Sequence, residues 1–164
     1  MVIPFICIIM MTIPFEFENY IGKNVYDIGV EVRSRQIKEL VFYKVVNSKF
    51  DFFGNDIENI FFHINETETI KEIDLYLSNI NNNLYEGLTG RYGEPTRKLK
   101  EDQLLKSENS PTNPNNYSKE YSTREIEGNE KPSIVIWEKE DFQILLFFNR
   151  IQNTTKINFT SKIY

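Results

Sequence analysis

The chain has 164 residues and a mass of 19.5 kDa, with 40% hydrophobic and 26% charged residues and a mean hydropathy of -0.43. This composition is typical of a soluble globular chain, with one domain or two small fused units. A single cysteine excludes an internal disulfide, a CxxC redox pair and a multi-cysteine zinc site, and a single histidine, His63, excludes a multi-histidine metal site within the chain. The net charge of -5 argues against a nucleic-acid binder. It fits a protein partner that is itself basic, and it fits ordinary solubility equally well.

The first segment, residues 1–19, contains an apolar run from Val2 to Phe15 that two prolines interrupt. The run is too short to cross a bilayer as a helix, so we expect no transmembrane span. Two interpretations stay open: the tail of a signal sequence whose true start lies upstream, or a buried first strand. If Met1 is not the true start, we expect a protein of the bacterial envelope or a secreted protein, and otherwise a cytoplasmic one.

Residues 20–78 form the first of two expected units. Apolar residues at helical spacing before Gly29 predict a short helix. Alternating polar and apolar residues then predict three antiparallel strands joined by short polar turns. A strand-like segment at 39–46 lies outside this scheme. The helix positions are Ile21, Val25 and Ile28, and the strands are residues 49–53, 57–64 and 69–77.

Residues 79–164 form the second expected unit. Its helix is predicted by four apolar residues at helical spacing and ends at Gly93, which suits a left-handed cap, with Pro95 preventing continuation. A long polar loop is expected over 98–131, and three more strands follow it. The helix positions are Ile80, Leu84, Leu88 and Tyr92, and the strands are residues 133–138, 142–149 and 154–161.

The two units match when the chain is shifted by 84 residues, which places Phe53 on Trp137 and Ile60 on Ile144. The chain contains no alanine, the best helix former, and abundant isoleucine, phenylalanine and tyrosine favour strands. We therefore predict an α+β fold in which one antiparallel sheet is built from two tandem helix–three-strand units, with the helices packed on one face.

A short motif closes the second helix: Arg91, Tyr92, Gly93, Glu94 and Pro95 in succession, followed by Trp137 and the hairpin over 142–159. In this layout the chain resembles the beta-lactamase-inhibitor-protein-like superfamily, which includes the SmpA/OmlA outer-membrane lipoproteins. The resemblance implies a non-enzymatic, protein-binding module of the bacterial envelope. The first unit departs from the motif, because Val30 and Glu31 follow Gly29 there.

Catalytic chemistry has few candidates in this sequence. His63 fits a general base or a pH switch, but a sheet-face histidine paired to a neighbour is the favoured interpretation. There is no Gly-x-Ser-x-Gly elbow, and the clustered carboxylates fall in or beside expected hairpin turns. We expect no catalytic residue, no metal ion and no cofactor.

Both faces of the middle strands are apolar, which favours binding. Helices can cover one face, so the other meets either another element of the chain or a partner. The long loop adds two tyrosines amid acidic residues. The candidate binding residues are Phe61, His63, Leu145, Phe147, Tyr117 and Tyr121.

We therefore expect a non-catalytic protein-binding or inhibitor module, either an envelope interaction protein or an immunity-type protein that neutralises a toxin. The partner is another protein, with self-association left open. The alternative is a carrier of a small apolar ligand or lipid, held between the sheet and the N-terminal run. An enzyme centred on His63 is the third hypothesis.

Overall fold

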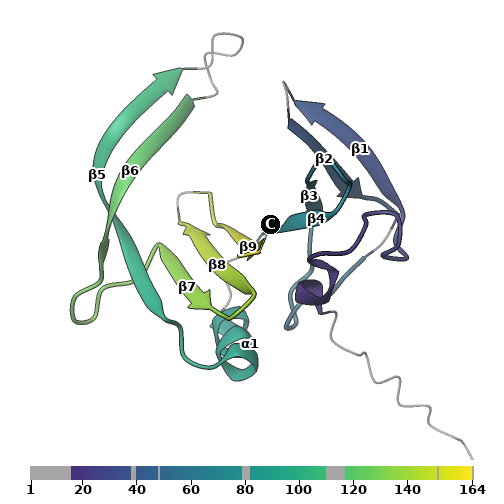
Figure 1. Ribbon diagram of the computed structural model, residues 1–164. Helices are drawn as coiled ribbons and strands as arrows, with labels where there is room; N and C mark the ends of the chain where they lie inside the picture. Colours follow the sequence, from purple (N-terminus) through teal and green to yellow (C-terminus); the bar gives the residue numbers. More distant parts are fainter. Residues whose placement is uncertain are drawn as a thin grey trace, which may run out of the picture.

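The computed structural model describes residues 16–37, 40–47, 49–78, 82–109, 117–150 and 152–163. The nine strands in this part of the chain form one antiparallel sheet in the order β1-β2-β3-β4-β9-β8-β7-β5-β6 (Figure 1). One α-helix, α1 (Asn82–Tyr92), and one 3-10 helix, η1 (Phe17–Tyr20), accompany it. The strands are β1 (Val32–Ile37), β2 (Leu40–Val45), β3 (Asn59–Ile64), β4 (Ile70–Leu77), β5 (Arg97–Asn109), β6 (Tyr117–Glu125), β7 (Ile134–Glu138), β8 (Phe142–Asn149) and β9 (Thr154–Ser161).

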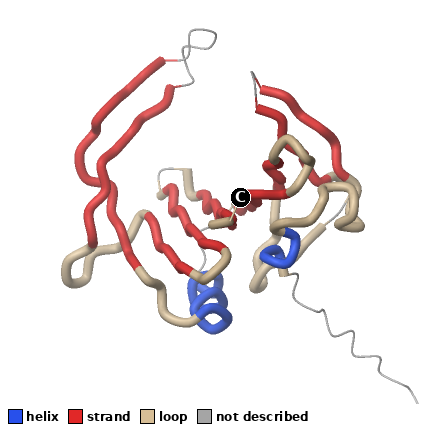
Figure 2. Tube along the Cα trace, viewed as in Figure 1, coloured by secondary structure: helices blue, strands red, loops and turns tan. Residues whose placement is uncertain are grey.

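The sheet is strongly curved. Its two edges, the β1–β2 arm and the β5–β6 arm, turn toward the same side, while α1 and η1 lie on the opposite side (Figures 1 and 2). We call the concave side between the arms the inner face and the side that carries the helices the outer face. The curvature follows from strand twist, which accumulates across a sheet of this width.

The hydrophobic core lies between the outer face and the helices. Alternate residues of β4 and β9 are fully buried there, Ile73 and Leu75 beside Ile157 and Phe159. Trp137 is also fully buried, and its indole Nε1 donates a hydrogen bond of 2.9 Å to the carbonyl of Gly93. This bond ties β7 to the end of α1. Further core residues from the helices are Phe17, Leu84 and Leu88.

The pairing of β4 with β9 lies in the middle of the sheet. Asp74 faces Asn158 across this pair, 84 residues further along the chain. From β4 the order β3-β2-β1 leads to one edge, and from β9 the order β8-β7-β5 leads toward the other, with β6 added outside β5. Outward from this pair, the strands on each side therefore follow in decreasing sequence order, as far as β1 on one side and β5 on the other.

The expected fold of two helix–three-strand units is wrong: the described chain is mostly β, with a single short α-helix. The first helix is absent because the backbone of that segment pairs with the start of β4. The amide of Gly22 donates to the carbonyl of Ile70 at 2.8 Å, and that of Val25 donates to Glu68 at 3.0 Å. Val25 and Ile28 are buried here without a helix, and Ile21 is partly buried.

The strand expected over 49–53 is also absent. Phe53 and Gly54 have positive φ angles of 53° and 75°, so the chain turns back there and sends Phe52 into the core. β2 pairs with β3 instead. It lies within the strand-like segment 39–46, which the repeat did not include.

The polar loop expected over 98–131 is largely a hairpin, β5 with β6. The sequence of these strands is mostly polar, so the alternation of polar and apolar residues that signals a strand is weak. Cross-strand ion pairs accompany the backbone pairing, as between Arg97 and Glu125 at 3.7 Å. The N-terminal run lies outside the described residues, and both interpretations of it stay predictions.

The remaining strands lie where the alternation predicts them. The segments 57–64, 69–77, 133–138, 142–149 and 154–161 contain β3, β4, β7, β8 and β9. The second helix is present as α1, and Gly93 follows it with a φ of 80°. None of the described helices is long and apolar enough to cross a membrane.

Two glycines of α1 give a matched test of the packing between α1 and the turn at Phe53. A Cβ at Gly87 would lie 2.4 Å from the Cγ of Phe53, whereas a Cβ at Gly90 would meet nothing within 4 Å. We expect Gly90→Ala to stabilise the protein by about 0.5–1 kcal/mol, and Gly87→Ala to destabilise it by about 1–3 kcal/mol. Urea unfolding of both variants measures the difference, and equal stabilisation by both would contradict this packing.

Candidate functional site on the inner face

The inner face carries the side chains that alternate with the core residues. They come from five adjacent strands, β2, β3, β4, β9 and β8, and their register follows from the strand pairing. The inner-face residues include Phe42 and Lys44 of β2, Phe61 and His63 of β3, Glu72, Asp74 and Tyr76 of β4, Lys156, Asn158 and Thr160 of β9, and Leu145 and Phe147 of β8.

A network of charged and polar groups occupies the middle of this face, around Asp74. The side chain of Asp74 is only 6% exposed. Its Oδ2 lies 3.0 Å from the Nε2 of His63, and its Oδ1 lies 2.8 Å from the Nζ of Lys156. Asn158 donates through Nδ2 to the same Oδ1 at 2.8 Å and also to Glu72. Three strands, β3, β4 and β9, are thus joined through one carboxylate.

Burial raises the pKa of the Asp74 carboxyl, but hydrogen bonds with His63, Asn158 and Lys156 outweigh burial. The net effect is a pKa below the ordinary value of an aspartate. Asp74 is therefore a carboxylate at neutral pH, with a cation and two further polar side chains around it.

Aromatic rings form a row across the same face, passing beside the network. The ring centroids of Phe42 and Phe61 are 5.4 Å apart and those of Phe61 and Tyr76 are 5.6 Å apart, both edge to face. The Nζ of Lys156 lies 5.8 Å from the centroid of Tyr76 and 5.9 Å from that of Phe147. Lys156 thus continues the row from β4 to β8 through cation–π contacts.

The structure brings four of the six sequence-predicted binding residues to this face. Phe61, His63, Leu145 and Phe147 all lie on it, and each is partly buried. Tyr121 lies apart, on β6, where it pairs with Leu104. Tyr117 pairs with Asn109 at the far end of the same arm, and its side chain lies outside the described part of the structure.

Sequence reasoning missed the polar centre of the site and half of the aromatic row. The strands 69–77 and 154–161 were expected. Their alternation alone places four side chains on the face away from the core: Asp74, Tyr76, Lys156 and Asn158. What the sequence lacked was the pairing of β4 with β9, which brings these side chains together. The other missed residues are Phe42 and Glu72.

The ligand atoms of His63, Glu72 and Asp74 lie within 4.8 Å of one another, a spacing that a metal ion can use. Both oxygens of Asp74 already have partners, however, and one of these is the ammonium of Lys156. A cation would have to displace Lys156, which supplies the positive charge that the carboxylates need. The group is therefore better described as a hydrogen-bonded network around an ion pair than as a metal centre.

The contact of His63 with Asp74 has the geometry that orients a general base. The hydroxyl of the network, on Thr160, donates to Asn158. Among the described residues, this hydroxyl and His63 therefore do not form a nucleophile–base pair.

An open cavity of about 480 Å³ lies away from the inner face, between residues 18–23 and the ends of β8 and β9. Its walls mix charged and apolar side chains, including Glu18, Lys23 and Asp141 beside Phe142. The apolar space expected for a lipid carrier adjoins the N-terminal run, which lies outside the described residues, so the carrier hypothesis stays a prediction.

No protein-family model, curated protein or solved structure matches this chain. The resemblance to the beta-lactamase-inhibitor-protein-like superfamily stays a prediction. The helix–three-strand layout that suggested it is not the layout of the described structure.

The variant Asp74→Asn tests the network. Lys156 would lose its counter-ion in a site where Asp74 is nearly buried, so we expect a loss of about 1–3 kcal/mol in the free energy of unfolding at pH 7. The folded-state pKa of Asp74 is depressed, so its stabilisation is present above the ordinary value of 3.8 and is lost as the pH falls through the lower folded pKa.

The difference between the wild type and Asp74→Asn should therefore shrink in acid, which urea unfolding from pH 7 to pH 2.5 can follow. Glu140→Gln, at an exposed position, is the control and should change stability little at any pH. A gap between wild type and Asp74→Asn that stays constant below the ordinary aspartate pKa would contradict the assignment.

Proposed function

We propose that this chain is a non-catalytic protein-binding module, of the inhibitor or toxin-immunity kind, and that its inner face receives the partner. The observation that carries the proposal is the row of Phe42, Phe61, Tyr76, Lys156 and Phe147 across five adjacent strands. The described helices pack on the outer face, so the row lies on the side of the sheet that they do not cover (Figure 1).

The chemistry of the row supports a protein partner. Interfaces between proteins are anchored by partly buried aromatic side chains with polar groups around them. Here the aliphatic side chains of Leu145 and Ile134 adjoin Phe147, while the Asp74 network lies beside the rings. Strands hold these groups, so little ordering is needed when a partner binds.

The partners of His63 support a non-catalytic role. Its Nε2 contacts Asp74, and Asp74 is shared with Lys156 and Asn158. A general base needs a substrate proton within reach, whereas His63 here closes a network that joins strands. The Asp74 carboxylate already has its ion-pair partner, Lys156, within the chain, which lowers the cost of desolvating it when a partner binds.

Photo-crosslinking in the native host tests the proposal directly. A benzophenone amino acid replaces Phe147 on the inner face, and a second variant carries it in place of Glu86, which is exposed on α1. We expect a discrete crosslinked protein from the Phe147 position and none from the Glu86 position, with the partner identified by mass spectrometry. The purified pair should then lose about ten-fold or more in affinity with Phe147→Ala.

Three outcomes count against the proposal. Crosslinks from Glu86 alone would place the partner on the helices, and no protein crosslink from Phe147 would remove the inner face as a partner site. A crosslinked species made only of this chain would assign the face to self-association.

A further inference from the structure

We infer that the β1–β2 arm of the inner face binds an acidic segment of the protein partner, through Arg33, Arg35 and Lys44 beside Phe42 and Phe61. The inference rests on the proposed function, because it names the chemistry of the partner that this face receives. It also reverses the expectation of a basic partner that the net charge of the chain suggests.

The three cations are neighbours on one face of the arm. In the register of β1 with β2, Arg33 lies opposite Lys44 and Arg35 lies opposite Phe42. Lys44 in turn lies opposite Phe61, with its Nζ 5.9 Å from the centroid of that ring. Three cations and two aromatic rings therefore lie next to one another on three adjacent strands.

Most of the positive charge of this group has no counter-charge among the described residues. Arg33 forms an ion pair of 3.6 Å with Glu31, and both side chains are more than half exposed. Among the described residues, no carboxylate lies within ion-pair distance of Arg35 or Lys44. Two unbalanced cations thus lie beside two aromatic rings in a chain whose net charge is -5.

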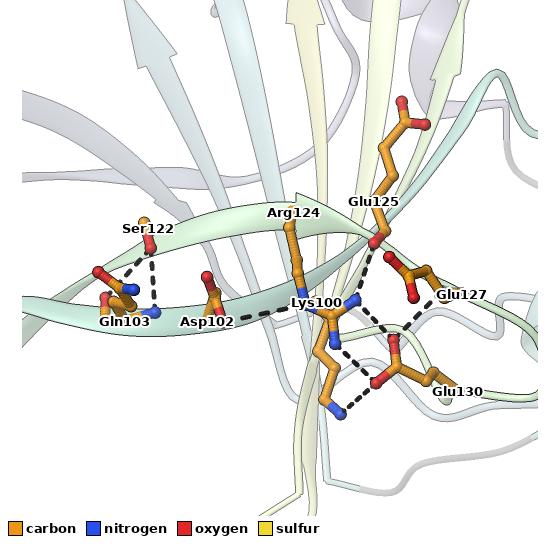
Figure 3. Close-up of polar contacts among 8 residues, drawn as sticks. All are labelled: Lys100, Asp102, Gln103, Ser122, Arg124, Glu125, Glu127 and Glu130. Carbon is orange, nitrogen blue, oxygen red and sulfur yellow. Dashed lines mark hydrogen bonds and ion pairs between the residues drawn. The ribbon is translucent and has the colours of Figure 1, made fainter.

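On the opposite arm, β5–β6, two cations share one carboxylate of the chain. There Arg124 and Lys100 both bind the carboxylate of Glu130, at 2.7 and 2.9 Å, and Arg124 also faces Asp102 (Figure 3). Hydrogen bonds from Arg124 and Lys100 lower the pKa of Glu130 well below the usual range. Lys100 and Arg124 of the β5–β6 arm are therefore neutralised by carboxylates of the chain itself, whereas Arg35 and Lys44 of the β1–β2 arm are left for a partner.

The rings favour a protein segment over a single-stranded nucleic acid. Bases stack on open ring faces, but Phe42 and Phe61 are at 79° to each other and Phe61 and Tyr76 are at 86°. Lys44 and Lys156 also lie over two of these rings. Carboxylates of a peptide, by contrast, can pair with the guanidinium of Arg35 while its apolar side chains pack on Phe42.

Peptide binding to the full chain tests the inference. The probe is a fluorescein-labelled peptide of repeated Glu-Glu-Leu, with Lys-Lys-Leu as its charge-reversed counterpart and oligouridylate as the nucleic-acid arm. The test variant is Arg35→Glu with Lys44→Glu. The control is Lys49→Glu with Lys131→Glu, which makes the same change in net charge at two exposed positions outside the arm.

Fluorescence anisotropy is measured at physiological salt, where exposed charges more than about 8 Å apart are screened. We expect the affinity for the glutamate peptide to exceed that for the lysine peptide by about ten-fold or more. The arm variant should lose about ten-fold or more in affinity for it, and the control should stay within about two-fold. Equal binding of the two peptides, equal losses in both variants, or tighter binding of oligouridylate would each overturn the inference.

This outcome is separable from that of the proposed function. Crosslinking from Phe147 reports whether the inner face holds a protein, whatever the charge of that protein. A crosslinked partner together with failed peptide binding would reject the acidic segment and keep the protein-binding function.

Discussion

The pairing of β4 with β9 is the contact on which the rest of the sheet depends. It joins strands from the two halves of the chain through six residue pairs, and without it the sheet would split into two smaller sheets with exposed edges. On the outer side the pair buries Ile73 and Phe159 in the core, and on the inner side it sets Asp74 opposite Asn158. One contact therefore contributes both to the core and to the candidate site.

The polar network at this junction contributes more to the register of β4 against β9 than to the net free energy of unfolding. A buried ion pair gains little over apolar packing, because removing its charges from water costs about as much as their attraction returns. A slip of one residue, however, would turn Asp74 toward the apolar outer face and expose core residues instead. The correct register also places Lys156 between Tyr76 and Phe147, which makes the aromatic row continuous.

The sequence predicts those elements whose side chains alternate against one core. Five strands and α1 satisfy this condition and lie where expected. The spacing predicts a helix wrongly at Val25, which is buried although its amide donates to Glu68 in the turn before β4. It does not predict the β5–β6 arm, whose sequence is mostly polar. The partner of His63 could not be named either, because Asp74 lies eleven residues away on the next strand.

Native-state hydrogen exchange tests most directly whether the two halves form a single rigid sheet with one inner face. We expect the amides of β4 and β9 to exchange only through global unfolding, together with those of β3 and β8, while the β1–β2 and β5–β6 arms exchange faster. Exchange of the β4 and β9 amides at a lower free energy than those of β3 or β8 would show that the halves separate before they unfold. The aromatic row would then not be one continuous surface, which would contradict a single binding face.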